Sequence, residues 1–238
     1  MNDMRSPSLD TETISDLSAK LGSGNEVTQL QAIADLANCG DGGMEVLIDF
    51  LLKRQADKIS VTCLDGKAYQ TLLQLDSQRA KEVMQTHFAK GVVPLETESG
   101  IDYEPLQKLL VQQDFQSADR LTSQTMCAAA GSEAVARGWL YFSEVAQIKN
   151  ADLNTINNLW LVYSEGKFGF SVQRKMWLNL GKNWEKLWLQ IGWKKDGSFT
   201  RYPTDFTWSL EAPKGHLPLS NQIRGNKTIS SIFAHPLW

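Results

Sequence analysis

The sequence predicts an all-α protein in which a small N-terminal helical bundle precedes a second helical domain. Apolar residues recur at intervals of three and four along much of the 238-residue chain, the spacing that places side chains on one helix face. Stretches containing glycine and proline interrupt this pattern, and one of them, residues 91–100, divides the chain into two parts. A content of 42% apolar residues is enough to bury a core in one large domain or two smaller ones.

The first domain opens with a predicted pair of antiparallel helices. Residues 30–37 and 44–52 both carry apolar side chains at helical spacing, and the Gly-Asp-Gly-Gly sequence at 40–43 breaks the pattern between them. The pair resembles one unit of a HEAT-type repeat, but a solenoid needs several copies and only one is evident. The prediction is therefore a small bundle.

Helical spacing continues from Tyr69 to about Phe88, where the linker begins. We therefore expect an N-terminal helical bundle over residues 1–88 and a second domain over residues 89–238.

The second domain contains several predicted helices. One covers residues 106–110, and the next begins at Phe115 with Asp114 as its N-cap. Asp152 has the position of an N-cap before the apolar stripe at 153–161.

Two further helices are expected, one from Ser171 to Leu180 and one that begins at Asn183. Tryptophans at helical spacing belong to the core more often than to a ligand site, and this interpretation applies to four of them: Trp160, Trp177, Trp184 and Trp188.

Periodicity ends at residues 192–215, a long predicted loop that is rich in aromatic residues. Loops lie at the surface, so exposed rings in this loop require a packing partner or a ligand. A short helix is expected next, over residues 216–225. One face of that helix would carry Leu217, Ser220, Asn221 and Arg224, which combine an apolar contact, an amide and a guanidinium.

Composition limits the class of protein. Apolar stretches are too short to span a membrane, the N-terminus has no secretory signal, and the odd cysteine count favours three buried thiols, Cys39, Cys63 and Cys127. Residues 167–227 hold eleven basic and four acidic residues, and all eight tryptophans follow residue 138. A flat, apolar, anionic partner fits this region, which leaves nucleic acid, an acidic lipid surface and a conjugated carboxylate ligand as candidates.

The sequence offers little support for catalysis. His87, His216 and His235 are dispersed, and no zinc-protease, nucleophile-elbow or phosphate-loop motif is present. We interpret His216 as structural in preference to a metal ligand. A single-stranded nucleic-acid-binding module is the main alternative, because it would also combine aromatic and basic residues, although the overall charge of -3 opposes it.

Four groups of residues carry a resemblance to a known family. They are Gly-Ile-Asp-Tyr at 100–103, Phe-Gly-Phe-Ser-Val-Gln at 168–173, Phe-Thr-Trp at 206–208, and Gly-His-Leu-Pro-Leu with Asn-Gln-Ile-Arg-Gly within 215–225. Over roughly residues 88–238 the chain resembles the genomes-uncoupled-four family, and its extra N-terminal domain resembles that of cyanobacterial members.

The resemblance implies an all-helical, cup-shaped core that binds protoporphyrin IX and magnesium protoporphyrin IX beneath a mobile loop. It also implies a regulatory protein, not an enzyme, which has no catalytic cofactor and stimulates magnesium chelatase through the large porphyrin-binding subunit of that enzyme. By position, the residues that contact the ligand would be Arg201, Tyr202, Phe206, Trp208, His216, Leu217, Pro218, Asn221, Gln222 and Arg224. Tyr202 replaces a tryptophan of relatives, which keeps a flat ring but changes the stacking contact.

The chemistry of the ligand assigns roles within this set. Arg201 and Arg224 can each form a paired, charge-assisted hydrogen bond with a propionate. Magnesium prefers oxygen ligands, so Asn221 is favoured over His216 as an axial ligand to porphyrin-bound magnesium, with no other metal bound directly by the protein. We expect a cytoplasmic monomer of cyanobacterial type that binds no nucleic acid and contacts membranes only peripherally.

Overall fold

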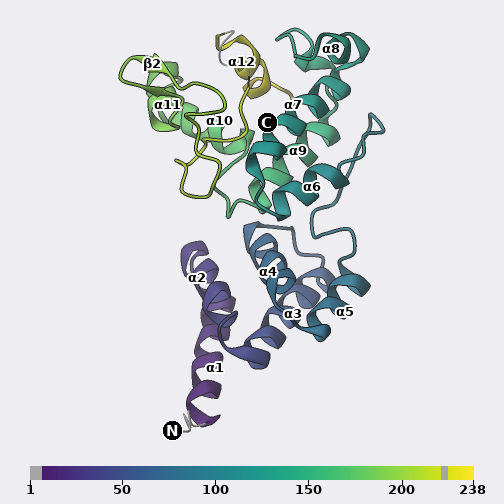
Figure 1. The fold of residues 1–238 in the computed structure, drawn as a ribbon, viewed down its shortest axis with the longest axis vertical. Coiled ribbons are helices and arrows are strands. Elements are labelled where there is room, and N and C mark those ends of the chain that lie inside the picture. The colour runs from purple at the N-terminus through teal and green to yellow at the C-terminus, as the bar shows by residue number, and fades with distance from the viewer. Residues whose placement is uncertain (1–6, 221–224) are drawn as a thin grey trace. The chain divides into compact units, whose positions relative to one another are not determined.

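The computed structural model describes residues 7–220 and 225–238, and it divides into two compact units between Val92 and Val93 (Figure 1). The secondary structure is almost entirely helical, as the sequence predicts. Within the described residues, no helix is long and apolar enough to cross a membrane.

The first unit consists of helices and short connections. Its described elements are α1 (Pro7–Ser23), α2 (Glu26–Leu36), α3 (Gly40–Ala56), α4 (Cys63–Gln74) and α5 (Gln78–His87). The helices predicted around residues 30–37 and 44–52 are confirmed, and the helical spacing from Tyr69 to Phe88 corresponds to α4 and α5, which residues 75–77 separate. Helix α1 was not predicted. Helix α2 begins after Asn25, whose side chain accepts a hydrogen bond from Thr28 N at 3.0 Å and caps the helix.

Residues 40–43 are not the break that the sequence suggested, because Gly40 begins α3 and the glycines form its first turn. A Cβ atom on Gly43 would collide with the carbonyl of Leu36, and one on Gly42 would lie 2.7 Å from the Cδ1 of Ile14. The glycines therefore permit close approach of α1 and α2 to the start of α3.

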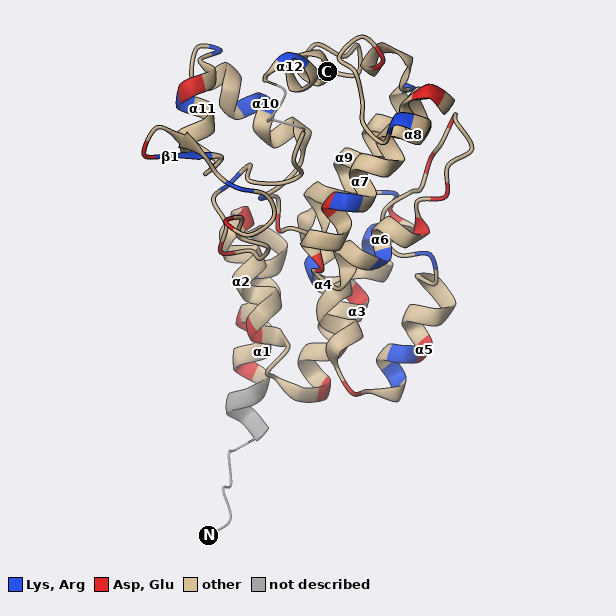
Figure 2. Ribbon diagram, turned by 45° about the horizontal axis from the view of Figure 1, so that its top comes forward, with Lys and Arg blue, Asp and Glu red and all other residues tan. Residues whose placement is uncertain are grey.

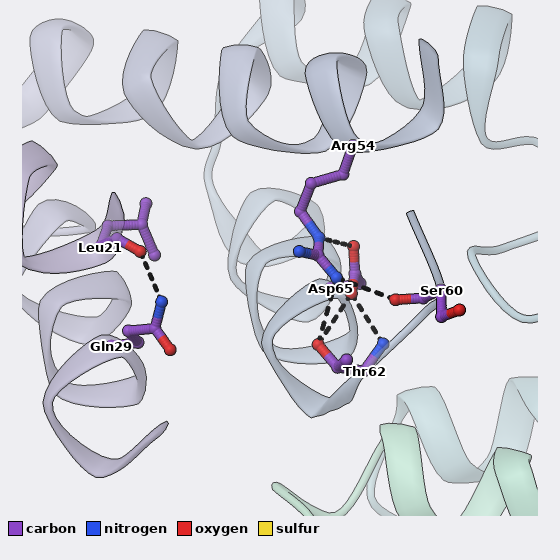
Figure 3. A network of polar contacts seen from close by, with 6 residues as sticks. All are labelled: Leu21, Gln29, Arg54, Ser60, Thr62 and Asp65. Atoms are coloured by element: carbon purple, nitrogen blue, oxygen red, sulfur yellow. Dashed lines mark hydrogen bonds and ion pairs between the residues drawn. The ribbon is translucent and has the colours of Figure 1, made fainter. Parts of the chain in front are cut away.

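A buried ion pair joins the end of α3 to the start of α4 (Figure 3). Arg54 donates from Nε to Asp65 Oδ1 at 2.7 Å and from its terminal nitrogen to Asp65 Oδ2 at 2.8 Å. Asp65 also accepts from Thr62 N at 2.7 Å and completes the capping box of α4. These bonds satisfy a carboxylate that is only 4% exposed.

The second unit has a helical core and a loop-rich C-terminal part. Its described elements are α6 (Glu104–Val111), α7 (Phe115–Ala130), α8 (Ser132–Arg137), the 3₁₀ turn η1 (Val145–Gln147), α9 (Asn150–Val162), α10 (Phe170–Asn179), α11 (Trp184–Gln190), β1 (Lys194–Lys195), β2 (Ser198–Phe199) and α12 (Lys227–Phe233). Helices α6, α7 and α9 lie side by side, and α10 contacts both α11 and α12 (Figure 1).

Helix α9 begins three residues earlier than predicted, and Asp152 is not its N-cap. Lys149 occupies the cap position, and Asp152 lies inside the helix, fully buried. Its carboxylate accepts hydrogen bonds from Thr97 Oγ1 at 2.6 Å, Ser99 Oγ at 2.8 Å and Tyr103 OH at 2.9 Å. Asp152 thus anchors the extended segment before α6, and the Gly-Ile-Asp-Tyr sequence contributes Tyr103 to this network.

Three other predicted helix starts have different outcomes. Asn183 caps α11 as expected, because its side chain accepts from Lys186 N at 3.0 Å, and Asp114 caps α7 by accepting from Ser117 N at 3.1 Å. Helix α10 begins after Gly169, so Ser171 is inside its first turn and does not cap it. Gly169 has φ +129°, a conformation that favours glycine.

The tryptophans predicted to belong to the core do so to different extents. Trp160 and Trp188 are buried, whereas Trp177 and Trp184 are half-buried. Trp177, Trp184 and Trp188 form a continuous column with Trp193, with ring centroids 4.8–5.2 Å apart. Cys63 and Cys127 are buried thiols, but Cys39 is only half-buried, so the expectation for Cys39 was wrong.

The C-terminal part differs most from the sequence-based prediction. A short hairpin of β1 and β2 interrupts the predicted loop, and α12 was not predicted. The helix expected over residues 216–225 is wrong for residues 216–220, which are not helical and bury both Leu217 and Leu219. A single apolar helix face cannot account for two buried positions that lie two residues apart, because such positions point to nearly opposite sides of a helix. The remaining predicted residues at 221–224 lie outside the described residues.

Candidate functional site

The candidate site is a cavity of about 380 Å³ in the second unit, open to solvent. Helix α7 forms one wall, the turn after α8 and helix α12 form others, and the loop that follows β2 contributes the rest. Its lining residues are Asp119, Arg120, Ser123, Gln124, Met126, Cys127, Gly138, Trp139, Leu140, Tyr202, Leu219, Ser220, Thr228 and Ile232. The size is within the range of about 300 to 1,000 Å³ that small-molecule sites have.

Helical spacing explains how α7 forms its wall. Asp119, Ser123, Met126 and Cys127 lie at i, i+4, i+7 and i+8, so their side chains share one face. The N-terminal part of the helix is held by its buried ring, Phe115, which stacks on Trp160 with centroids 6.0 Å apart. The wall therefore rests on the rigid core of the unit.

An aromatic cluster in the loop faces this wall. The ring of Tyr202 lies 6.2 Å from that of Phe206 and 5.8 Å from that of Trp208, centroid to centroid. Phe206 is buried, Trp208 is half-buried and donates from Nε1 to the carbonyl of Pro203 at 3.0 Å, and Tyr202 lines the cavity. Because Tyr202 keeps 39% exposure, it is the ring of this cluster that is available to a ligand.

His216 holds the loop in place from inside. Its Nδ1 lies 2.6 Å from the carbonyl of Ile191, and its Nε2 accepts a hydrogen bond from Thr207 N at 3.3 Å. A carbonyl can only accept, so Nδ1 carries the hydrogen, and burial keeps the ring neutral by lowering the pKa of His216. Trp193 adds a bond from its Nε1 to the His216 carbonyl at 2.7 Å. Both ring nitrogens are thus engaged by the protein itself.

The segment after His216 is fixed by α10. Gln173 donates from one amide nitrogen to the carbonyls of Gly215 and Pro218, each at 2.9 Å. Gly169 N donates to the Leu217 carbonyl at 3.0 Å. The Phe-Gly-Phe-Ser-Val-Gln sequence therefore anchors the Gly-His-Leu-Pro-Leu sequence, which explains why these two motifs occur together.

Asp119 is the most unusual group in the cavity. It is only 2% exposed, and the one bond that the described residues provide comes from Leu219 N to its Oδ1, at 2.7 Å. Burial raises the pKa of Asp119 to about 7, and the bond from Leu219 opposes this shift only in part. Its neighbour in the cavity wall, Ser220, has a buried hydroxyl oxygen without a partner among the described residues.

The other ionisable groups of the cavity are Arg120, Cys127 and Tyr202. Arg120 is exposed at the rim, where it donates to Ser117 Oγ at 3.2 Å. Burial raises the pKa of the Cys127 thiol, and burial followed by the charge of Asp119 raises that of Tyr202. Basic residues also recur along α10, α11, β1 and α12 of the same unit (Figure 2).

The structure places the predicted contact residues in different environments. Among those described, Tyr202 lines the cavity, whereas His216, Leu217 and Pro218 are buried beneath the loop and Arg201 is exposed on it. Asn221, Gln222 and Arg224 lie outside the described residues.

The α7 wall and the Trp139–Leu140 turn were not predicted from the sequence to be part of a site. Asp119 was the available signal, because an acidic residue beside Ala118 on the apolar face of a predicted helix requires an explanation. No group of three or more metal-ligating side chains occurs in the part of the chain that the structure describes.

Comparison with protein families gives two matches that together cover most of the chain. Residues 96–236 match the family described as GUN4-like, and residues 6–89 match an ARM-like repeat domain described as the GUN4 N-terminal domain.

Individual relatives support the same relationship. A Ycf53-like protein of Synechocystis sp. is 45% identical over 96% of this chain and 97% of its own length. The chloroplastic tetrapyrrole-binding protein of Arabidopsis thaliana is 37% identical over 58% of this chain and 56% of its own. The solved structure of GUN4 from Chlamydomonas reinhardtii has a TM-score of 0.58 and 39% identity, covering 61% of this chain and 93% of the other.

Proposed function

Because this chain belongs to the GUN4-like family, we propose that it is a regulatory protein that binds a tetrapyrrole in the cavity of its second unit. The observation that carries the proposal is the combination of an apolar cavity of about 380 Å³, one exposed ring from the loop, and one arginine at the rim. The Arabidopsis relative, whose name states tetrapyrrole binding, supports the class of ligand.

The cavity suits one edge of a rigid aromatic disc. Met126, Trp139, Leu140 and Ile232 supply apolar surface, and Tyr202 supplies a ring that can stack. The cavity is open, so the remainder of a macrocycle would extend towards solvent. In that pose the propionates lie outside the apolar walls, where Arg120 can form a charge-assisted hydrogen bond with one of them.

The expected contact residues complete the proposed site. We assign Tyr202 to direct stacking, and Phe206, Trp208, His216, Leu217 and Pro218 to the support of the loop that carries it. Arg201 and Arg224 remain candidate partners for propionates, Gln222 a candidate contact, and Asn221 the candidate axial ligand to porphyrin-bound magnesium.

We propose protoporphyrin IX and magnesium protoporphyrin IX as the ligands, and stimulation of magnesium chelatase through its large porphyrin-binding subunit as the function. The protein would act as a cytoplasmic, monomeric regulator without a catalytic step of its own. Support comes from the family match and from a relative in Synechocystis that matches the chain over almost its full length.

Fluorescence provides the test. Trp139 lines the cavity, so protoporphyrin IX should quench tryptophan emission saturably, and Trp139→Phe should reduce the amplitude of quenching without abolishing binding followed by porphyrin absorbance. A matched control is Trp238→Phe, which removes a C-terminal tryptophan outside the cavity lining. Absence of saturable binding at about 10 μM porphyrin, an affinity weaker than about -7 kcal/mol, would contradict the proposal.

A further inference from the structure

Asp119 has no explained role in the proposed site. An ionised carboxylate in an apolar wall is costly unless a cation or several donors compensate it. Here the described residues offer one backbone donor, Leu219 N, and the second carboxyl oxygen has no partner among them. The hydroxyl of Ser220, in the same wall, is also unpartnered within the described chain. Because these polar groups lack hydrogen-bond partners in the cavity wall, they can interact with a ligand that enters the cavity.

We propose that Asp119 is a specificity-determining residue, which orients the tetrapyrrole by excluding its carboxylate edge from the cavity. The inference rests on the proposed function. It concerns the orientation of the bound tetrapyrrole and which other tetrapyrroles the cavity rejects. Specificity of this kind comes from repulsion of the wrong ligand, which a buried like charge provides.

Charge placement supports this orientation. A macrocycle with both propionates on one edge can insert its apolar edge beside Asp119 and leave the propionates near Arg120 at the rim. A macrocycle with carboxylates around its whole circumference has no such edge, so every pose places one carboxylate in the cavity with Asp119. In a water-poor wall, two like charges repel more strongly than in solvent.

The repulsion should depend on pH. Because burial raises the pKa of Asp119 to about 7, the group is mostly ionised above that pH and mostly neutral below it. The remaining ionisable groups that line the cavity are Arg120 and Cys127 on α7 and Tyr202 on the loop. The pKa values of Cys127 and Tyr202 are raised from values already above neutrality, so these two groups do not titrate between about pH 6 and 8.

The experiment compares two porphyrins on the full-length protein. Protoporphyrin IX has both propionates on one edge, whereas coproporphyrin I has one propionate on each pyrrole ring, so that every edge between two rings carries a propionate. The measured quantity is the ratio of their dissociation constants at about pH 8 and about pH 6, in the wild type and in Asp119→Asn. Asparagine keeps an oxygen that can accept from Leu219 N, so the variant removes the charge and retains the bond.

At pH 8 we expect Asp119→Asn to narrow the preference for protoporphyrin IX by about tenfold, chiefly by strengthening coproporphyrin binding. Lowering the pH to about 6 should also reduce the preference of the wild type for protoporphyrin IX over coproporphyrin. It should leave the preference of Asp119→Asn nearly unchanged. Asp196→Asn is the matched control. It removes an acidic residue from the β1–β2 turn, at φ +49°, which asparagine tolerates, and should leave the ratio unchanged.

The possible results separate the two proposals. If the wild type binds neither porphyrin, the proposed function fails and this inference fails with it. If both porphyrins bind but the ratio is the same in Asp119→Asn and at both pH values, the role of Asp119 alone is overturned. The comparison of the wild type at the two pH values tests the role of Asp119 even if the variant does not fold.

Discussion

Asp119 and Arg120 are consecutive residues of α7 with opposite environments. The carboxyl of Asp119 is buried in the cavity wall, while the guanidinium of Arg120 is exposed at the rim. A helix turns by about 100° per residue, so one charge can face the cavity while the next faces its entrance. This arrangement suits a ligand whose apolar and anionic parts lie on different edges.

The role of Arg120 can be tested by removing its charge. Arg120→Ala should weaken binding of protoporphyrin IX by about tenfold, because one propionate loses a charge-assisted partner at the rim. Lys175→Ala, on the exposed part of α10, is the matched control and should change the affinity less than about twofold. Equal losses in both variants, measured by porphyrin titration, would indicate diffuse attraction by the basic surface instead of a defined contact.

The composition of the sequence singled out the aromatic loop, and the family resemblance named Tyr202 within that loop as an expected ligand contact. Asp119 acquires its environment from Leu219, which is 100 residues away in the chain. Spacing within one helix contains no information about such a contact, so the carboxyl could be seen in the sequence but not its position in a cavity wall.

The irregular segment after β2 is ordered by hydrogen bonds to other elements. Gln173 of α10 holds the carbonyls of Gly215 and Pro218, and His216 bonds to the carbonyl of Ile191, the residue that follows α11. These buried backbone groups have no helix or sheet of their own, so side chains must satisfy them. The cavity wall contributed by Tyr202 and Leu219 depends on these anchors.

Gln173→Ala should therefore destabilise the second unit by about 2 to 4 kcal/mol, because two buried carbonyls lose their donor. Urea unfolding followed by tryptophan emission reports on this unit alone, since all eight tryptophans follow residue 138. Gln190→Ala, at the exposed end of α11, should cost less than about 0.5 kcal/mol. A cost for Gln173→Ala as small as that of the control would contradict the anchoring role.

At the scale of elements, helices with a clear apolar repeat were predicted, whereas α1, α12 and the β1–β2 hairpin were not. Helices such as α7 and α9 carry enough apolar repeats to define a face. Helix α12 has only seven residues, and the hairpin has two residues per strand, so neither gives a measurable period. Residues 216–220 contain apolar residues at positions compatible with a helix, but tertiary hydrogen bonds determine their irregular path.

Each unit of the whole molecule has its own core and its own polar network. In the first, Arg54 and Asp65 join α3 to α4 beside fully buried residues such as Leu47 and Ile48. In the second unit, Asp152 and Trp160 are fully buried, and the helices around them all belong to that unit. Two complete cores indicate that each unit can fold independently.

The last prediction follows from this independence: residues 93–238 alone should bind protoporphyrin IX with an affinity within about threefold of that of the full chain. Every residue that lines the cavity belongs to this unit.

Circular dichroism and porphyrin titration of the fragment make the measurement, and residues 1–92, prepared separately, are the control that should bind no porphyrin. A folded fragment that loses more than about tenfold in affinity would assign part of the tetrapyrrole site to the N-terminal unit. If the fragment keeps full affinity, the ARM-like N-terminal unit would act on stability or on the contact with a protein partner. None of the residues that line the cavity belongs to that unit.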